Sequence, residues 1–224
     1  MSTVIVCGMP SEKSILMAAL PGLLVLSGTD KLNLPSLVPP TCARLISMGL
    51  CGGLSPDLVV PDCVAATSVI DRAGDKAAAD GEFNARAGVA FATAGGNLKP
   101  APYYSSGLLN EANEVPQRAA IYSKYGAHAI DDETRFVVAD AQRRDIPFNV
   151  FRSVSDASDD NLPLLAIGDI MNPDGSPNLA YLAAALGQDQ GPNAESVFSV
   201  AFHYGQSLRA LEAMANALAQ IITE

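Results

Sequence analysis

The chain has 224 residues, of which 49% are hydrophobic and only 17% are charged. This balance predicts a large buried core and excludes an intrinsically disordered chain, which needs few apolar residues and many charges. Acidic residues outnumber basic ones by 24 to 14, giving a formal net charge of -10. We therefore expect no nucleic-acid partner, because contacts to phosphates require a basic surface.

The length fits one large domain, and no linker or internal repeat divides residues 1–224. The longest apolar stretches are too short to span a bilayer, so no membrane insertion is expected. Met1 and Ser2 lead directly into a strand-like run without a basic and apolar leader, which predicts a cytoplasmic protein. The cysteines have no C-x-x-C spacing, which predicts free thiols in a reducing compartment. They are Cys7, Cys42, Cys51 and Cys63.

The first half of the chain alternates apolar runs with glycine-rich or polar segments. The expected strands share a short run of β-branched or other apolar residues, and they cover 3–7, 23–26, 44–48, 61–70, 89–93 and 104–108. A helix is expected around 15–20, with Ser11 as its N-cap. The stretch 71–88 shows no clear pattern.

The second half continues the alternation. The expected helices cover 115–125, 133–144 and 197–221, and the expected strands cover 129–131 and 148–153. Gly126 is expected to stop the first of these helices, and 156–191 is expected to be mostly loop. Alternating buried strands and helices predict a layered α/β domain with a largely parallel or mixed sheet.

Four polar or glycine-rich clusters each directly follow an expected strand. They are Gly8–Glu12, Gly49–Gly53, Asp131–Glu133 and Ser155–Asp156. Ligands of open α/β sheets usually bind at the carboxyl ends of the strands, so we expect the clusters to meet in one site.

The glycine-rich cluster Gly49–Gly53 has two explanations. It is either a tight turn without a ligand, or a turn whose glycines let main-chain amides approach an anion or a sugar oxygen. The G-x-G-x-x-G spacing of a dinucleotide site is absent.

The acidic clusters also have structural and chemical explanations. Asp131, Asp132 and Glu133 either start a helix, where acids suit the helix dipole, or include a carboxylate that binds two ribose hydroxyls. A metal site would need a histidine or a further acidic ligand at suitable spacing, and none is present. Asp156 is either a turn cap or a partly desolvated acid whose raised pKa lets it donate a proton. Glu12 is either an acid of a first helical turn or a second catalytic acid or base.

Taken together, these segments resemble the purine nucleoside phosphorylase and nucleosidase superfamily in order and spacing. The segments that carry the resemblance are Gly8 with Glu12 (G-x-x-x-E), the glycine-rich 47–56 with 62–64, 129–133 (V-[ED]-M-E), and 146–156 (vPf…R-x-[IV]-S-D). Two branches are similar in pattern: the 5'-methylthioadenosine/S-adenosylhomocysteine nucleosidases, and the phosphorylase-like enzymes of bacterial hopanoid biosynthesis. Leu162-Pro163 and Asn172–Gly175 resemble the second branch more.

The resemblance implies a three-layer α/β/α domain with a central mixed sheet. It also implies cleavage of the N-glycosidic bond of a purine nucleoside, with adenine as the expected base, or of an adenosylated derivative. Asp156 would protonate the purine, Ser155 would orient Asp156, and Glu133 would hold the ribose hydroxyls. Glu12 would activate water in a nucleosidase, whereas a phosphorylase uses phosphate. The substrate-binding positions carried over from the family are Gly8, Gly49, Leu50, Gly52, Asp131, Asp132 and Glu133.

The resemblance implies no cofactor besides phosphate as an optional co-substrate, and family members commonly form homo-oligomers. Three positions depart from the family pattern. Asp132 replaces a methionine that packs beneath the ribose, Leu50 replaces a frequent serine, and Ser47 replaces the arginine of many phosphorylases. A phosphate site would then need Arg44, Arg72 or a neighbouring subunit. The alternative hypothesis is a non-catalytic nucleoside-binding protein that retains the fold.

Overall fold

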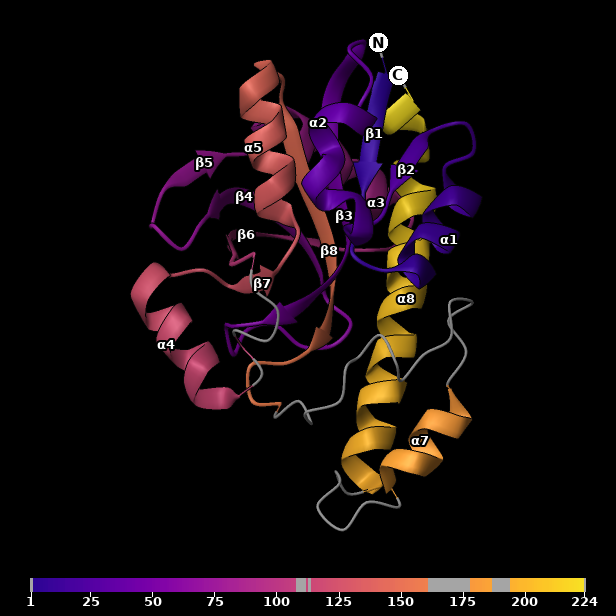
Figure 1. Ribbon diagram of the computed structural model, residues 1–224, viewed down its shortest axis with the longest axis vertical. Helices are drawn as coiled ribbons and strands as arrows, with labels where there is room; N and C mark the ends of the chain where they lie inside the picture. Colours follow the sequence, from indigo (N-terminus) through magenta and orange to yellow (C-terminus); the bar gives the residue numbers. More distant parts are fainter. Residues whose placement is uncertain (1, 108–111, 113, 161–177, 187–193, 224) are drawn as a thin grey trace.

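A computed structural model describes residues 2–107, 112, 114–160, 178–186 and 194–223. In these ranges the strands are β1 (Ser2–Val6), β2 (Leu24–Leu26), β3 (Cys42–Gly53), β4 (Cys63–Ile70), β5 (Lys76–Ala78), β6 (Leu98–Ser105), β7 (Ala129–Asp131) and β8 (Phe148–Asp156). The helices are α1 (Pro10–Ala19), the 3-10 helix η1 (Gly28–Asn33), α2 (Leu34–Leu37), α3 (Gly81–Thr93), α4 (Val115–Tyr125), α5 (Thr134–Arg144), α7 (Leu179–Leu186) and α8 (Ala194–Thr223). Figure 1 shows their arrangement.

All eight strands of the described residues belong to one mixed sheet, in the order β2-β1-β3-β7-β6-β4-β5, with β8 pairing both β3 and β4. β3 is long enough to change partners along its 12 residues. It pairs β1 and β8 in parallel, and its last two residues pair β7 in the antiparallel sense. Strands β3, β8, β4, β6 and β7 therefore close a ring of hydrogen-bonded neighbours.

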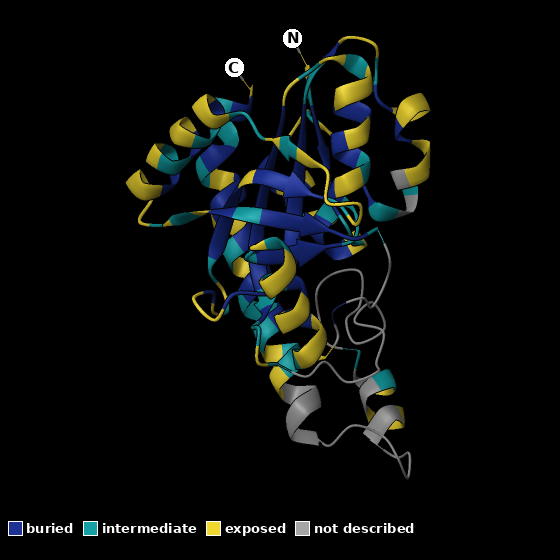
Figure 2. Cartoon of the chain, turned by 90° about the vertical axis from the view of Figure 1, so that its left-hand side faces the viewer, coloured by how far each residue is buried: buried dark blue, intermediate teal, exposed yellow. Residues whose placement is uncertain are grey.

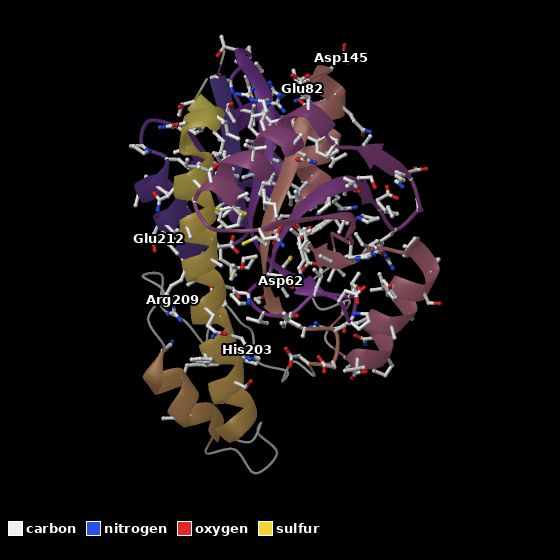
Figure 3. The ribbon with its side chains drawn as sticks, turned by 180° about the vertical axis from the view of Figure 1, so that it is seen from behind. Asp62, Glu82, Asp145, His203, Arg209 and Glu212 are labelled. Carbon is white, nitrogen blue, oxygen red and sulfur yellow. The ribbon has the colours of Figure 1, made fainter. Side chains whose placement is uncertain are left out.

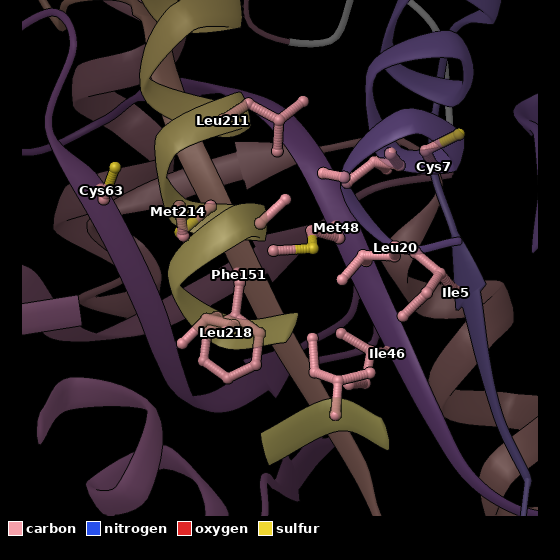
Figure 4. Close-up of a cluster of buried hydrophobic side chains, with 14 of the residues drawn as sticks. Ile5, Cys7, Leu20, Ile46, Met48, Cys63, Phe151, Leu211, Met214 and Leu218 are labelled. Atoms are coloured by element: carbon pink, nitrogen blue, oxygen red, sulfur yellow. The ribbon is translucent and has the colours of Figure 1, made fainter. Parts of the chain in front are cut away.

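Helices cover both faces of the sheet, which confirms the predicted layered architecture (Figure 1). On one face α1, α3 and α8 pack over a buried cluster that includes Ile46 and Phe151 (Figure 4). On the other face α5 packs over a cluster that includes Leu45 and Val150. Successive residues of β3 and β8 point to opposite faces, so each strand contributes to both clusters. Figure 2 shows the buried strands enclosed by helices with exposed outer surfaces.

Most expected elements are confirmed, including α4 and β7 at their predicted bounds. Gly126 adopts the left-handed conformation, with φ 63°, that ends α4. The strand expected at 89–93 is wrong, because α3 continues through it with Phe83, Ala87 and Phe91 buried at helical spacing. The unassigned stretch 71–88 contains β5 and the start of α3.

Two further expectations are corrected. Ser11 is not the N-cap of α1, since Pro10 is already the first helical residue and Met9 occupies the cap. The segment 156–191, expected to be mostly loop, contains helix α7. Positions 161–177 and 187–191, which include Leu162-Pro163 and the stretch 172–175, lie outside the described residues.

No helix in the described part of the chain is long and apolar enough to cross a membrane. All four cysteines are buried free thiols. Burial raises the pKa of Cys63 to about 12 and that of Cys51 well above its ordinary value, so these thiols are packing residues and not nucleophiles.

Candidate active site

The carboxylate of Glu12 is fixed beyond the end of β1 by three main-chain amides. Its Oε2 accepts hydrogen bonds from the amides of Gly8 (2.7 Å) and Met9 (3.0 Å), and its Oε1 accepts one from the amide of Leu50 (2.9 Å). Glu12 is only 1% exposed and lies in the first turn of α1, where the helix dipole favours a negative charge. The clusters Gly8–Glu12 and Gly49–Gly53 are therefore in contact, as expected.

Gly49 and Gly52 lie inside β3, so the turn expected at Gly49–Gly53 is wrong. A Cβ atom on Gly49 would lie 2.6 Å from Glu12 Oε2 and 2.7 Å from Arg152 Nη1. A Cβ atom on Gly52 would lie 2.9 Å from Asp156 Oδ1. Glycine is required at these positions because charged side chains pack directly against the strand, and not because the backbone turns.

Arg152 of β8 is the buried cation at the centre of this region, with 1% of its surface exposed. Its Nη2 lies 2.6 Å from Asp131 Oδ2 and donates to Ser47 Oγ. Its Nη1 donates to the carbonyl oxygen of Leu50 at 3.1 Å. Ser47, which replaces the arginine of many phosphorylases, therefore helps to hold Arg152 in place.

Two serines at the end of β6 hold two aspartates at the end of β7. Ser105 Oγ donates to Asp131 Oδ1 and Ser106 Oγ donates to Asp132 Oδ1, each at 2.8 Å. Asp131 also accepts from Thr134 and pairs with the arginine of β8, so its carboxylate is used by internal contacts. The predicted contact of Asp131 with substrate stays a prediction, and Asp132 is half-buried.

Glu133 lies beside Glu12, across Gly8. A Cβ atom on Gly8 would lie 3.2 Å from Glu133 Oε2 and 3.3 Å from Glu12 Oε2. Burial, followed by the charge of Asp131, raises the pKa of Glu133 to about 7, while Arg152 opposes the shift. Burial also raises the pKa of Glu12, against the opposing effects of Arg152 and the three amides. Burial thus favours the neutral form of both neighbouring carboxyl groups.

Asp156 ends β8 opposite Gly52. Cys51 pairs with Val154 and Gly52 pairs with Asp156, so Ser155 is the extra residue of a β-bulge. Ser155 Oγ lies 2.6 Å from Asp156 Oδ2 and 3.1 Å from the carbonyl oxygen of Cys51. These contacts agree with the expected orienting role of Ser155.

Arg118 of α4 pairs with Asp156 through Nη2 and Oδ1, a contact that the sequence did not reveal. The two side chains are 1% and 8% exposed. Arg118 Nε donates to the carbonyl oxygen of Ala112 (2.9 Å), and Nη1 donates to those of Gly53 (3.2 Å) and Ala157 (2.6 Å). In the sequence, only helical spacing indicated that Arg118 is buried, because it places Arg118 on the same helix face as Ile121.

Helix α8 is attached to the same end of the sheet. Ser207 Oγ donates to the carbonyl oxygen of Val154 at 2.6 Å. His203, one turn earlier (Figure 3), has its Nδ1 3.7 Å from Asp160 Oδ2. Tyr204 Oη lies 2.7 Å from Ser11 Oγ, which joins α8 to the helix that carries Glu12.

The structure does not bring the expected phosphate donors to the carboxylates. Arg44 Nη2 lies 2.8 Å from Asp80 Oδ2, and Arg44 Nη1 donates to Asn149 near the start of β8. Arg72 lines a separate cavity of about 440 Å³ beside α4, together with Lys124. Across the described ranges, no group of three or more His, Cys, Asp or Glu side chains is placed to hold a metal ion.

The four predicted clusters therefore line one region, organised along β3. The Glu12 carboxylate lies at Gly49 and Leu50, and the Asp156 carboxylate lies at Gly52. Gly49 and Gly52 are three residues apart, a distance of roughly 10 Å in an extended strand. The arrangement places carboxyl groups at two points along β3.

Comparisons with known proteins agree with this arrangement. A family model described as the phosphorylase superfamily matches residues 3–172. The futalosine hydrolase of Helicobacter pylori strain 26695 is similar in structure, with a TM-score of 0.66 at 15% identity, covering 95% of this chain and 96% of that one. No curated protein sequence matches the chain.

Two further solved structures are 5'-methylthioadenosine/S-adenosyl homocysteine nucleosidases (MTAN). The Campylobacter jejuni MTAN has a TM-score of 0.66 at 14% identity, covering 96% of this chain and 99% of that one. A mutant of Helicobacter pylori MTAN with 5'-methylthioadenosine in its active site has a TM-score of 0.63 at 15% identity, covering 94% and 97%. At these identities the likeness shows a shared fold.

Proposed function

Since the chain belongs to the phosphorylase superfamily, we propose that it cleaves the N-glycosidic bond of a purine nucleoside with water as the nucleophile. The observation that carries this proposal is the placement of Glu12 and Asp156 at two positions of β3, three residues apart. Hydrolysis of a glycosidic bond commonly uses two carboxyl groups, one as the acid and one as the base.

Water is favoured over phosphate by the charges around Glu12. Glu12 and Glu133 flank Gly8, and the pKa values of both are raised by burial. The cation in contact with this region is Arg152, which is already paired with Asp131. Among the described residues, a phosphate dianion would therefore meet two acids beside a cation that already has a carboxylate partner, whereas water carries no charge.

The chemistry follows from these positions. Asp156 transfers a proton to a purine ring nitrogen as the electrons of the bond to C1' move to the base. Glu12 accepts a proton from the water that attacks C1', and Glu133 binds the ribose hydroxyls. The positive character that develops on the sugar is stabilised by the two neighbouring carboxyl groups. Nucleoside and water are consumed, and free base and free ribose derivative are formed.

We propose adenine as the base and an adenosylated derivative as the substrate class. The support is the sequence resemblance to the nucleosidases, together with structural similarity to proteins whose names refer to methylthioadenosine and futalosine. A role in hopanoid biosynthesis, a homo-oligomeric state and a cytoplasmic location stay predictions of the resemblance and the composition.

The test is release of free base from adenosine, 5'-methylthioadenosine, S-adenosylhomocysteine, futalosine and inosine, each with and without phosphate. We expect turnover in phosphate-free buffer, with free ribose derivative and no ribose 1-phosphate as product. A strict requirement for phosphate would overturn the choice of water. Tight binding of nucleosides by a folded protein, without cleavage, would instead support the non-catalytic alternative that Asp132 suggests.

A further inference from the structure

We propose that Arg118 is a positioning residue for the acid Asp156, which it orients and whose carboxylate it stabilises as the proton leaves. This inference rests on the proposed function, because it concerns the proton donor of that reaction. Arg118 belongs to α4, outside the four clusters that follow strands, and has no part in the mechanism described above.

The contacts of Arg118 fix its guanidinium group rigidly. Three carbonyl oxygens, from Ala112, Gly53 and Ala157, accept its hydrogen bonds, and Asp156 accepts another. Burying a guanidinium ion is unfavourable unless its donors are satisfied, and here they converge on the end of β3 and the end of β8. The cation is therefore built into the site and is not an exposed side chain that happens to reach Asp156.

Neighbouring side chains hold both oxygens of Asp156. Arg118 occupies Oδ1, and Ser155 Oγ lies 2.6 Å from Oδ2. Ser155 has a single hydroxyl hydrogen but two acceptors in reach, Asp156 Oδ2 and the carbonyl oxygen of Cys51 at 3.1 Å. Asp156 is therefore held at both oxygens, by a cation on Oδ1 and by a hydroxyl group on Oδ2.

In the proposed step the proton moves from Oδ2 to a purine ring nitrogen as the bond to C1' breaks. Asp156 is left as a carboxylate, and its new negative charge faces Arg118. The other ionisable groups nearby are Asp160, which accepts from the amide of Ala157, and His203, which lies beside Asp160. A fixed cation at the site of a developing negative charge lowers the barrier to proton transfer.

The test compares two leaving groups. An adenine nucleoside needs its base protonated, whereas the 4-nitrophenolate of 4-nitrophenyl β-D-ribofuranoside leaves without a proton. For Arg118→Met we expect a loss in kcat on the order of 100-fold with the adenine nucleoside and a loss of less than about 5-fold with the nitrophenyl riboside. Lys124→Met, which removes an exposed cation from the same helix, is the matched control and should retain both activities.

A second readout uses the adenine nucleoside alone. If Arg118 acts through Asp156, adding Arg118→Met to Asp156→Asn should cause no further loss in kcat. Should Arg118→Met fail to fold, Arg118→Lys provides the same comparison. Lysine keeps the positive charge but lacks the planar guanidinium group. We therefore expect a smaller loss in kcat, confined to the adenine nucleoside.

Equal losses on both substrates, or additive losses in the double variant, would overturn the inference and leave Arg118 a purely structural residue. Full activity of Arg118→Met on the adenine nucleoside would also overturn it. Each of these results requires an active wild-type enzyme. They are therefore distinguishable from failure of the proposed function, in which the wild-type protein releases no base from any nucleoside.

Discussion

Gly49 approaches the carboxylate of Glu12 so closely that a Cβ atom at Gly49 would lie 2.6 Å from Glu12 Oε2. The same atom would lie 2.7 Å from Arg152 Nη1, so neither charged group has room to move aside. We expect Gly49→Ala to destabilise the protein by about 1–3 kcal/mol and to lower kcat by displacing Glu12. Thermal denaturation and base release would measure the two effects.

The matched control is Gly88→Ala. Gly88 lies in α3 with no heavy atom within 4 Å of an added Cβ. Alanine should stabilise the helix there by up to about 1 kcal/mol and leave activity unchanged. Comparable destabilisation of both variants would show that the packing at Gly49 is not special.

Replacing Asp156 by asparagine removes the proposed proton donor while keeping its size. We expect Asp156→Asn to lower kcat for an adenine nucleoside by on the order of 10²- to 10⁴-fold, with a smaller change in KM, because the lost contribution belongs to the transition state. Asp159→Asn, at an exposed position three residues further along the chain, is the control. An Asp156→Asn variant with wild-type kcat would remove Asp156 from the mechanism.

Glu12→Gln tests the proposed base. Glutamine keeps one acceptor oxygen, which can serve either the amides of Gly8 and Met9 or the amide of Leu50, and it cannot take a proton from water. We expect kcat to fall on the order of 100-fold or more while nucleoside binding, measured by calorimetry, persists. Glu82→Gln is the control, since Glu82 is exposed on α3 and Figure 3 places it toward the opposite end of the molecule from His203. A Glu12→Gln enzyme that retains kcat would contradict the assignment.

Glu133 links the site to the pH dependence of stability. Its pKa is raised from the ordinary 4.5 to about 7, so the native state holds this proton more tightly than the unfolded state. The stabilisation is complete below pH 4.5 and is lost as the pH rises to about 7. Glu133→Gln cannot ionise, so its free energy of unfolding at pH 8 should exceed that of the wild type by roughly 1–3 kcal/mol.

Near pH 4 the Glu133→Gln variant and the wild type should be about equally stable, because both side chains are then neutral. Urea denaturation at the two pH values measures the difference. A stability difference that does not change with pH would contradict a proton held by Glu133. The variant should also bind ribose hydroxyls less well and show a higher KM.

The sequence predicted the parts of the site that depend on strand ends. Glu12 and Asp156 belong to the ends of β1 and β8, which are parallel to β3 and so end at a common edge, whereas β7, before Glu133, is antiparallel to β3. The order of the clusters was sufficient to group them. Local rules also located α4, because helices commonly end at a glycine in the left-handed conformation, as α4 does at Gly126.

The remaining features depend on contacts between distant residues. Glycines disfavour strands, so Gly49 and Gly52 suggested a turn, whereas the close packing of charged side chains keeps them in β3. The sequence does not distinguish the role of Asp131 from the roles of its acidic neighbours. In the structure, Ser105 and Arg152 contact its carboxylate oxygens. Arg118 lies 38 residues from Asp156 in the sequence, and helical spacing alone does not identify a partner.

β3 carries the contacts of both Glu12 and Asp156, and it has hydrogen-bonded neighbours on both sides in a closed ring of strands. The main chain against which both carboxyl groups pack is thus paired on each side and resists displacement. Substitutions outside this ring of strands, such as those in α8, leave that main chain in place. We expect substrate preference in this architecture to diverge readily in evolution while the bond that is cleaved stays the same.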